Sequence, residues 1–277
     1  MRDRDCVEFL QWCLPRLGLR WPGYRKVRGT VCKRVGRRLR ALGLVGLDAY
    51  RDVLAADTRE WEHLEAFCRI PISRFWRDRG VFERLGRDVL PALAADVRAR
   101  GERLVRCWSA GCASGEEAYS LRIAWREEVQ PGFPAAEISI LGTDAEPTMI
   151  ARAEAARYGA GSLKDLPAAW RESAFDRDGA VFRLRPELRQ GVVFRLQDIR
   201  EMQPEGPFDL ILCRNLAFTY FTEPLQRAVL ECIDRRLCDG GYLVIGTHEC
   251  LPCAAPGYAR LNGLPVYRRQ AKAGGRS

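Results

Sequence analysis

The stretch CWSAGCASGEEAYS, residues 107–120, is the part of the chain that decides the fold. The apolar residues Leu104 and Val105 precede it, and apolar positions at helical spacing continue after it at residues 121–125. This order predicts a strand, a glycine-rich turn and a helix. Small residues at such a turn let backbone N–H groups approach a ligand closely, although many such turns are only tight connections. The stretch therefore predicts the first unit of a nucleotide-binding type of α/β fold.

The chain after this unit alternates predicted strands with predicted helices. Strands are expected at residues 138–144, 192–198, 208–215 and 242–246, the last one entered through a turn at 239–241, and helices at 149–156 and 223–237. Residues 158–190 interrupt the alternation and predict a small α/β insertion, and residues 258–270 predict a closing hairpin around Asn262 and Gly263. We therefore expect a parallel sheet with crossover helices and a terminal antiparallel hairpin strand.

The residues before position 100 show helical periodicity instead. An apolar stripe from Val27 to Leu42 predicts a helix that ends at Gly43. Shorter helices are expected at 47–54 and 61–68, and a long amphipathic helix at 81–97. We therefore expect two domains: a helical one at residues 1–100, with its last helix as connector, and an α/β one at residues 101–277.

The net charge of +9 is unevenly placed along the chain. The segment between Phe9 and Leu47 has no acidic residue, and its basic residues are Arg16, Arg20, Arg25, Lys26, Arg28, Lys33, Arg34, Arg37, Arg38 and Arg40. Such a block indicates an acidic partner, either a nucleic acid or an acidic protein surface, and the alternative is a solvated helix face. The absence of carboxylates favours a partner.

Composition bounds the remaining function classes. No apolar run approaches the roughly 20 residues that span a bilayer, and residues 1–5 lack the apolar core of a signal peptide, so we expect no membrane insertion and a cytoplasmic protein. The 11 cysteines are expected to be reduced and mostly buried. Cys250 and Cys253, with His248, match half of a zinc site, but the other half is missing, so we expect no metal.

The candidate site residues stand where strands are expected to end, at Gly111, Asp144, Asp198 and Asn215. Ligands of open α/β sheets bind at the carboxyl ends of the strands. An acid after the second strand suits ribose hydroxyls, and an acid or amide one strand later suits an adenine amino group. The turn lacks the Gly-x-Gly-x-x-Gly and Gly-Lys-Ser/Thr patterns of dinucleotide and triphosphate sites. We therefore expect S-adenosylmethionine as cofactor, with Glu117 facing a polar or cationic part of it.

Residues 108–120, WSAGCASGEEAYS, resemble the signature of the CheR-type chemotaxis methyltransferases, Trp-Ser-Ala…Gly-Glu-Glu-Pro-Tyr-Ser. The similarity extends through 143–144, 208–215 and 246–249, and takes in the basic helix that ends RRLRALGL at 37–44. The resemblance implies a Rossmann-like class I methyltransferase sheet plus an all-helical N-terminal domain. It also implies transfer of a methyl group from S-adenosylmethionine to glutamate carboxylates of a chemoreceptor-like protein, with the basic helix at 25–40 facing an acidic receptor helical bundle.

The resemblance also implies roles for individual residues. The cofactor would be held by Glu117, Asp144, Asp198, Ile199, Asn215 and Leu216, and the family's Thr and Arg before the connector helix fall on Ser73 and Arg77. Arg77 would orient the substrate carboxylate, with help from the hydroxyl of Tyr220; the alternative for Arg77 is a surface ion pair with Asp78 or Glu83. This chain departs from the family where Pro71 replaces an Asn, where Tyr220 lies one residue late, and in a somewhat short insertion.

Protein-glutamate O-methylation is thus the first hypothesis, based on the combined motifs and the basic helix. The chemistry agrees with it, because a carboxylate nucleophile is already ionised near pH 7 and needs no strong base. The alternatives are a methyltransferase of the same fold acting on a small carboxylate or other nucleophile, a nucleic-acid methyltransferase, and a non-catalytic adaptor. Residues 213–216 lack the Asn/Asp-Pro-Pro-aromatic element of base methylation, so we expect no DNA or RNA partner. We expect a monomer.

Overall fold

The computed structural model describes residues 2–252, 257–261 and 263–270, and it divides into two compact units. One unit is Met1–Pro71 with Thr219–Gln226, and the other is Ile72–Phe218 with Arg227–Ser277. The division falls after Pro71 rather than near residue 100. The reason is packing: Val89, Leu93 and Val97 of the expected connector are buried in the same core as the strand residue Val105, so this helix belongs to the α/β unit.

The second unit is built on a sheet with the strand order β6-β2-β1-β7-β8-β10-β9. The strands are β1 (Leu104–Ala110), β2 (Glu137–Asp144), β6 (Val192–Leu196), β7 (Phe208–Leu212), β8 (Leu237–Val244), β9 (Tyr258–Arg260) and β10 (Val266–Arg269). Strands β6, β2, β1, β7 and β8 pair in parallel, whereas β10 is antiparallel to both β8 and β9. The predicted parallel sheet with a terminal hairpin is confirmed; Asn262, in the expected hairpin turn, lies outside the described residues.

One strand begins earlier than expected. The predicted turn at 239–241 lies inside β8, where Gly240 has a φ of +76° and the pairing with β7 shifts register between Phe208 and Leu210. A bulge of this kind lets glycine residues stay within a strand.

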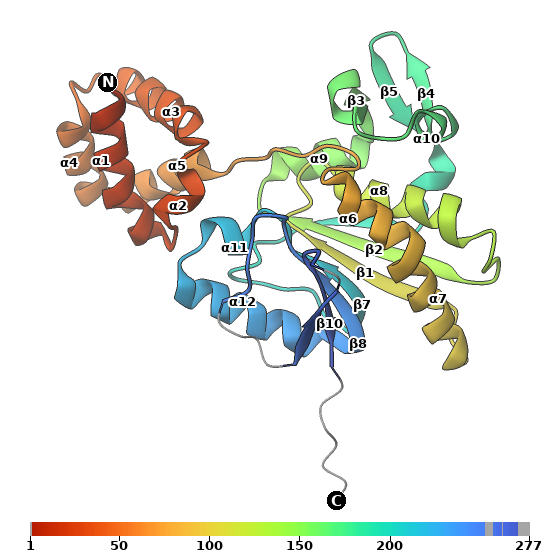
Figure 1. Cartoon of the computed structure of the whole chain (residues 1–277). Helices are drawn as coiled ribbons and strands as arrows, with labels where there is room; N and C mark the ends of the chain where they lie inside the picture. Colours follow the sequence, from red (N-terminus) through yellow and green to blue (C-terminus); the bar gives the residue numbers. More distant parts are fainter. Residues whose placement is uncertain (1, 253–256, 262, 271–277) are drawn as a thin grey trace, which may run out of the picture. The chain divides into compact units, whose positions relative to one another are not determined.

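Helices precede and connect these strands, and a small subdomain is inserted among them (Figure 1). The helices are α6 (Arg79–Arg84), α7 (Leu90–Ala99), α8 (Glu116–Ala124), α9 (Pro147–Ala155), α10 (Ala168–Ala174), α11 (Ala217–Tyr220) and α12 (Glu223–Arg236), with π-helical turns at Leu85–Val89 and Trp125–Val129 and 3₁₀ turns at Ala160–Leu163 and Pro186–Leu188. The insertion is an antiparallel sheet of β3 (Arg157–Gly159), β5 (Val181–Leu184) and β4 (Phe175–Asp178) beside α10, as expected for residues 158–190.

The N-terminal unit is helical, as predicted. Its helices are α1 (Asp3–Cys13), α2 (Trp21–Tyr24), α3 (Arg28–Ala41), α4 (Leu47–Ala56) and α5 (Thr58–Cys68), with a 3₁₀ turn at Leu14–Leu17. The apolar stripe of α3 buries Val31, Val35 and Leu39, and the helix ends before Leu42, which is exposed. Among the described residues, no helix is long and apolar enough to cross a membrane.

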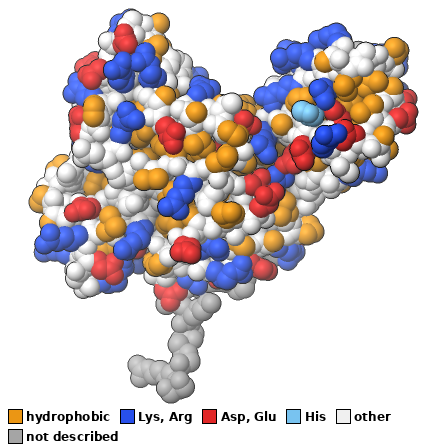
Figure 2. Space-filling view, turned by 180° about the vertical axis from the view of Figure 1, so that it is seen from behind, with side chains coloured by type: hydrophobic (Ala, Val, Ile, Leu, Met, Phe, Trp, Pro, Cys, Tyr) orange, Lys and Arg blue, Asp and Glu red, His pale blue; other side chains and the backbone are white. Residues whose placement is uncertain are grey.

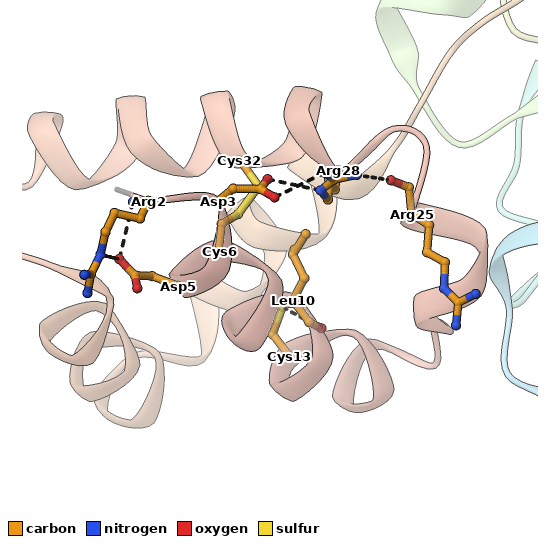
Figure 3. The surroundings of a disulfide bond; sticks show 9 residues. All are labelled: Arg2, Asp3, Asp5, Cys6, Leu10, Cys13, Arg25, Arg28 and Cys32. Atoms are coloured by element: carbon orange, nitrogen blue, oxygen red, sulfur yellow. Dashed lines mark hydrogen bonds and ion pairs between the residues drawn. A yellow bond between two sulfur atoms is a disulfide. The ribbon is translucent and has the colours of Figure 1, made fainter.

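A disulfide joins Cys6 of α1 to Cys32 of α3 (Figure 3), so the expectation that all cysteines are reduced is wrong for this pair. Beside it, Arg28 at the start of α3 donates to both carboxylate oxygens of Asp3, each at 3.1 Å. The free cysteines of the described residues are mostly buried, as expected. Covalent and ionic links thus hold the basic helix on α1.

The disulfide leads to a prediction for stability. Closing a loop with a sequence separation of 26 residues restricts the unfolded chain, which is worth about 3 kcal/mol. Cys32→Ser is therefore expected to lower the free energy of unfolding of the oxidised protein by about this amount, measured by chemical denaturation.

The same measurement in excess dithiothreitol gives the control, because both proteins then lack the crosslink and their stabilities should converge. Cys250→Ser, which removes an exposed free thiol, should change stability in neither condition. A loss of stability in Cys32→Ser that persists in full under reduction would show that packing, not the crosslink, is responsible.

Candidate active site

The predicted strand-end residues follow adjacent strands of the sheet. Gly111, Asp144 and Asp198 come at or after the carboxyl ends of β1, β2 and β6, and Asn215 follows β7. The strand order reverses at β1, which has β2 on one side and β7 on the other. Ligands of open α/β sheets bind at such a switch point, at the carboxyl edge. The topology therefore brings the predicted residues to one edge.

The glycine-rich turn after β1 is closely packed. Gly111 has a φ of +72°, and a Cβ placed there would lie 2.7 Å from Cδ2 of Leu216. Gly115 has a φ of +86°, and its Cβ would lie 2.9 Å from Ala153 and Phe194. Both positions therefore require glycine for conformation and for space. The turn brings the β1 end against Leu216, one of the predicted cofactor residues.

The carboxylate of Asp144 is held by backbone N–H groups on both sides. Its Oδ2 accepts a hydrogen bond from the N–H of Ala113 at 2.9 Å, and its Oδ1 accepts one from Glu146 at 3.0 Å. This fixes the acid of β2 against the turn after β1. Asp198 pairs instead with Arg200, whose N–H and Nε each donate to Oδ1 at 2.9 Å.

Glu117 lies in the first turn of α8 and accepts two side-chain hydrogen bonds. Its Oε1 accepts from Ser109 Oγ at 2.7 Å, and its Oε2 accepts from Arg214 Nη1 at 2.8 Å. The neighbouring Glu116, also in the first turn of α8, is buried and accepts from Ser114 Oγ. Ser109 and Arg214 were missed from the sequence, although Arg214 directly precedes the predicted Asn215.

Arg77 contacts Asn215, which follows β7. Its Nη2 donates to Asn215 Oδ1 at 3.1 Å, and its Nη1 donates to the carbonyl of Ile72 at 2.6 Å. The alternative of a surface ion pair with Asp78 or Glu83 is wrong, since Asp78 pairs with Arg214 at 2.7 Å and Glu83 with Arg79 at 2.7 Å. Ser73 is half-buried in the same segment.

Asn215 adopts a left-handed backbone conformation, with a φ of +54°. Its N–H donates at 2.9 Å to Oε2 of Glu249, which also accepts from the N–H of Gly246. Glu249 is buried. The motif at 246–249 predicts no role for Glu249; the structure shows that it fixes the turn that carries Asn215.

The remaining predicted residues are Ile199 and Tyr220. Ile199, the residue after Asp198, is buried. Tyr220 belongs to the N-terminal unit, where its ring lies 5.0 Å from that of Tyr24 and its carbonyl accepts from the N–H of Arg20 at 2.8 Å. A catalytic role for Tyr220 stays a prediction.

The set of hydrogen-bond acceptors decides which cofactor fits. Carboxylates of Glu117, Asp144 and Asp198 accept hydrogen bonds from hydroxyl, amino and ammonium groups and repel phosphates. S-adenosylmethionine carries such donors and no phosphate, so the residues present fit it. Within the described ranges, no group of His, Cys, Asp and Glu is arranged to hold a metal ion; Cys253 of the considered zinc half-site lies outside them.

Comparisons with known proteins agree with this geometry. The family described as CheR methyltransferase, SAM binding domain, matches residues 72–267. A chemotaxis protein methyltransferase of Listeria innocua is 36% identical over 196 residues, covering 70% of this chain and 71% of that protein. A probable chemotaxis protein methyltransferase of Rhizobium etli is 29% identical over 253 residues, covering 89% of this chain and 93% of that protein.

An uncharacterized 104.1 kDa protein of Rhodobacter capsulatus is 34% identical over 223 residues, and there the match spans 80% of this chain but only 23% of the relative. The family match includes all the strand-end residues described above, from Gly111 to Asn215, together with Arg77 and Glu249. The chain therefore belongs to the CheR methyltransferase family and is an S-adenosylmethionine-dependent methyltransferase.

Proposed function

We propose that this methyltransferase forms methyl esters on glutamate side chains of an acidic, chemoreceptor-like protein. The observation that carries the proposal is the placement of Arg77, whose guanidinium is held by Ile72 and Asn215 at the end of the β7 segment. Arginine has five N–H donors in a planar fork, and these two contacts use two of them. The fork suits a substrate carboxylate, which is the group that a protein-glutamate methyltransferase must orient.

Methyl transfer to a carboxylate requires few further functions of the protein. When bound, the cofactor supplies a methyl group on a positively charged sulfur. A glutamate carboxylate is already ionised near pH 7, so no side chain has to remove a proton from it. The chain's residues must orient the carboxylate and exclude water. We assign the first task to Arg77 and Tyr220, and cofactor binding to the predicted set of Ser73, Arg77, Gly111, Glu117, Asp144, Asp198, Ile199, Asn215 and Leu216.

The exposed face of α3 supports an acidic partner. Lys33, Arg37 and Arg40 recur at helical spacing and are exposed, while other basic residues of the block are used inside the unit. Arg38 forms a bidentate pair with the buried Glu60, and Arg34 donates to backbone carbonyls at the end of α5. Lys and Arg side chains are also spread over the face seen in Figure 2, with Asp and Glu between them. The α3 face is distinguished by its lack of such acidic neighbours in the sequence.

The relatives named chemotaxis protein methyltransferases support the same kind of partner. We therefore propose that Lys33, Arg37 and Arg40 contact an acidic helical surface of the substrate protein. A receptor substrate of this type places the reaction in the cytoplasm.

The first prediction concerns the product. Incubation with methyl-labelled S-adenosylmethionine and an acidic helical receptor fragment should give base-labile methyl ester, and Arg77→Ala should lower kcat roughly 100-fold because the carboxylate loses its orienting charge. The measurement is release of labelled methanol on mild alkaline treatment.

Arg79→Ala is the matched control, since the exposed Arg79 lies in the same segment but pairs with its i+4 neighbour Glu83; its kcat should be unchanged. Ester formation on small free acids but not on the protein fragment would contradict the proposal, as would full turnover in Arg77→Ala.

The second prediction concerns the basic face of α3. Charge reversal of Lys33, Arg37 and Arg40 to Glu should raise the KM for the acidic protein at least about tenfold at low salt, with the difference shrinking at high ionic strength. Affinity for the cofactor, measured by calorimetry, should not change.

Reversal of Arg87, Arg98 and Arg103, which are also exposed, makes the same change in net charge elsewhere and should leave the KM near that of the unmodified protein. Equal effects of the two triple variants would mean that net charge, and not the α3 face, attracts the substrate.

A further inference from the structure

Arg214 is a buried cation beside the site, with 1% of its side chain exposed. Arg214 lies two residues after the end of β7, and its guanidinium carbon is 5.2 Å from the ring centroid of Phe82. A charge this deeply buried is costly unless it is paired and hydrogen-bonded. Its pairing therefore shows what the fold uses it for.

One end of the guanidinium contacts the acid expected to face the cofactor. Nη1 donates to Oε2 of Glu117 at 2.8 Å. The other oxygen of Glu117 accepts from Ser109 Oγ. The carboxylate of Glu117 is thus fixed from two sides, by Ser109 of β1 and by Arg214 after β7.

The other end holds the turn that carries Arg77. Nη2 of Arg214 donates to the carbonyl of Arg77 at 2.8 Å and to Oδ2 of Asp78 at 2.7 Å. This turn is strained, because Trp76 and Asp78 have φ values of +59° and +61° without being glycine. A further support of the turn is the N–H of Trp76, which donates to Ser120 Oγ at 3.1 Å.

The contacts of Arg214 thus join the acid proposed to face the cofactor to the turn that carries the arginine proposed to orient the substrate. A cation that only neutralised Glu117 would need neither the carbonyl of Arg77 nor the carboxylate of Asp78. We propose that Arg214 is a positioning residue that couples the cofactor acid Glu117 to the strained turn that aims Arg77 at the substrate carboxylate. The inference rests on the proposed roles of Glu117 and Arg77, because Arg214 acts through its hydrogen bonds to Glu117, Arg77 and Asp78.

Substitutions at both ends of the link test this. Arg214→Met removes both contacts and should weaken S-adenosylmethionine binding and lower kcat, each about tenfold or more. Arg214→Lys keeps one charge but not the fork, so its cofactor affinity should stay within about threefold while kcat still falls about tenfold. Asp78→Asn removes the charge from the turn side only and leaves the contact with Glu117, so kcat should fall about tenfold while cofactor affinity falls by less than about threefold.

The link itself is tested by combining substitutions. Asp78→Asn should have no further effect on kcat in the Arg214→Lys background if the two residues act through one contact. Multiplicative effects, or unchanged affinity and kcat in folded Arg214→Met, would overturn the proposal. If Arg214→Met does not fold, the Lys and Asn variants still decide.

Arg100→Met is the control for a merely structural role. Arg100 pairs at 3.1 Å with the buried Asp209, near the opposite end of β7, so its loss should lower thermal stability without changing cofactor affinity or kcat. Calorimetric affinity for S-adenosylmethionine needs no methyl acceptor. A wild-type protein that binds the cofactor but esterifies no glutamate would thus refute the proposed function while the affinity difference between Arg214→Met and Arg214→Lys still tests the role of Arg214.

Discussion

The parallel pairing of β1 with a strand on each side is the constraint on which the site depends. Ala110 lies opposite Thr143 of β2, and Ser109 lies opposite Leu212 of β7. With these registers, the three strands end at the same level, so the glycine turn, Asp144 and the Arg214-Asn215 segment emerge together. The close approach of Leu216 to Gly111 then follows, because only a residue without a side chain leaves room for it.

Buried charges are the second constraint, and they act in both units. In the α/β unit Arg214 forms ion pairs with both Glu117 and Asp78. In the N-terminal unit the bidentate hydrogen bond from Arg38 holds the pKa of Glu60 below its usual value, and burial, together with the hydrogen bond to Glu60, raises the pKa of Tyr50. Such pairs are costly to break from one side. Arginines in such buried pairs stabilise the fold, whereas exposed arginines without them stay available to a partner.

Prediction from sequence succeeded where one local pattern dictates one structure. The spacing of apolar residues, together with the Gly and Pro residues between elements, predicted the strands at 138–144 and 208–215 and the helices of the N-terminal unit near their observed positions. It failed where distant packing competes with the local pattern. Glycines at 240–241 predict a turn but lie in a bulged strand, and the helix that ends at Ala99 belongs to the α/β core because its apolar face packs there.

The sequence by itself determined the strand–turn–helix unit at 107–120, the family resemblance, the acids at the strand ends and the excess of positive charge, since each is a property of contiguous residues. Only the tertiary structure decided that Arg214 joins Glu117 to the Arg77 turn, that Glu249 supports Asn215, and that Cys6 meets Cys32. These contacts join residues far apart in the chain. Their existence depends on strand order and helix packing, which no local spacing encodes.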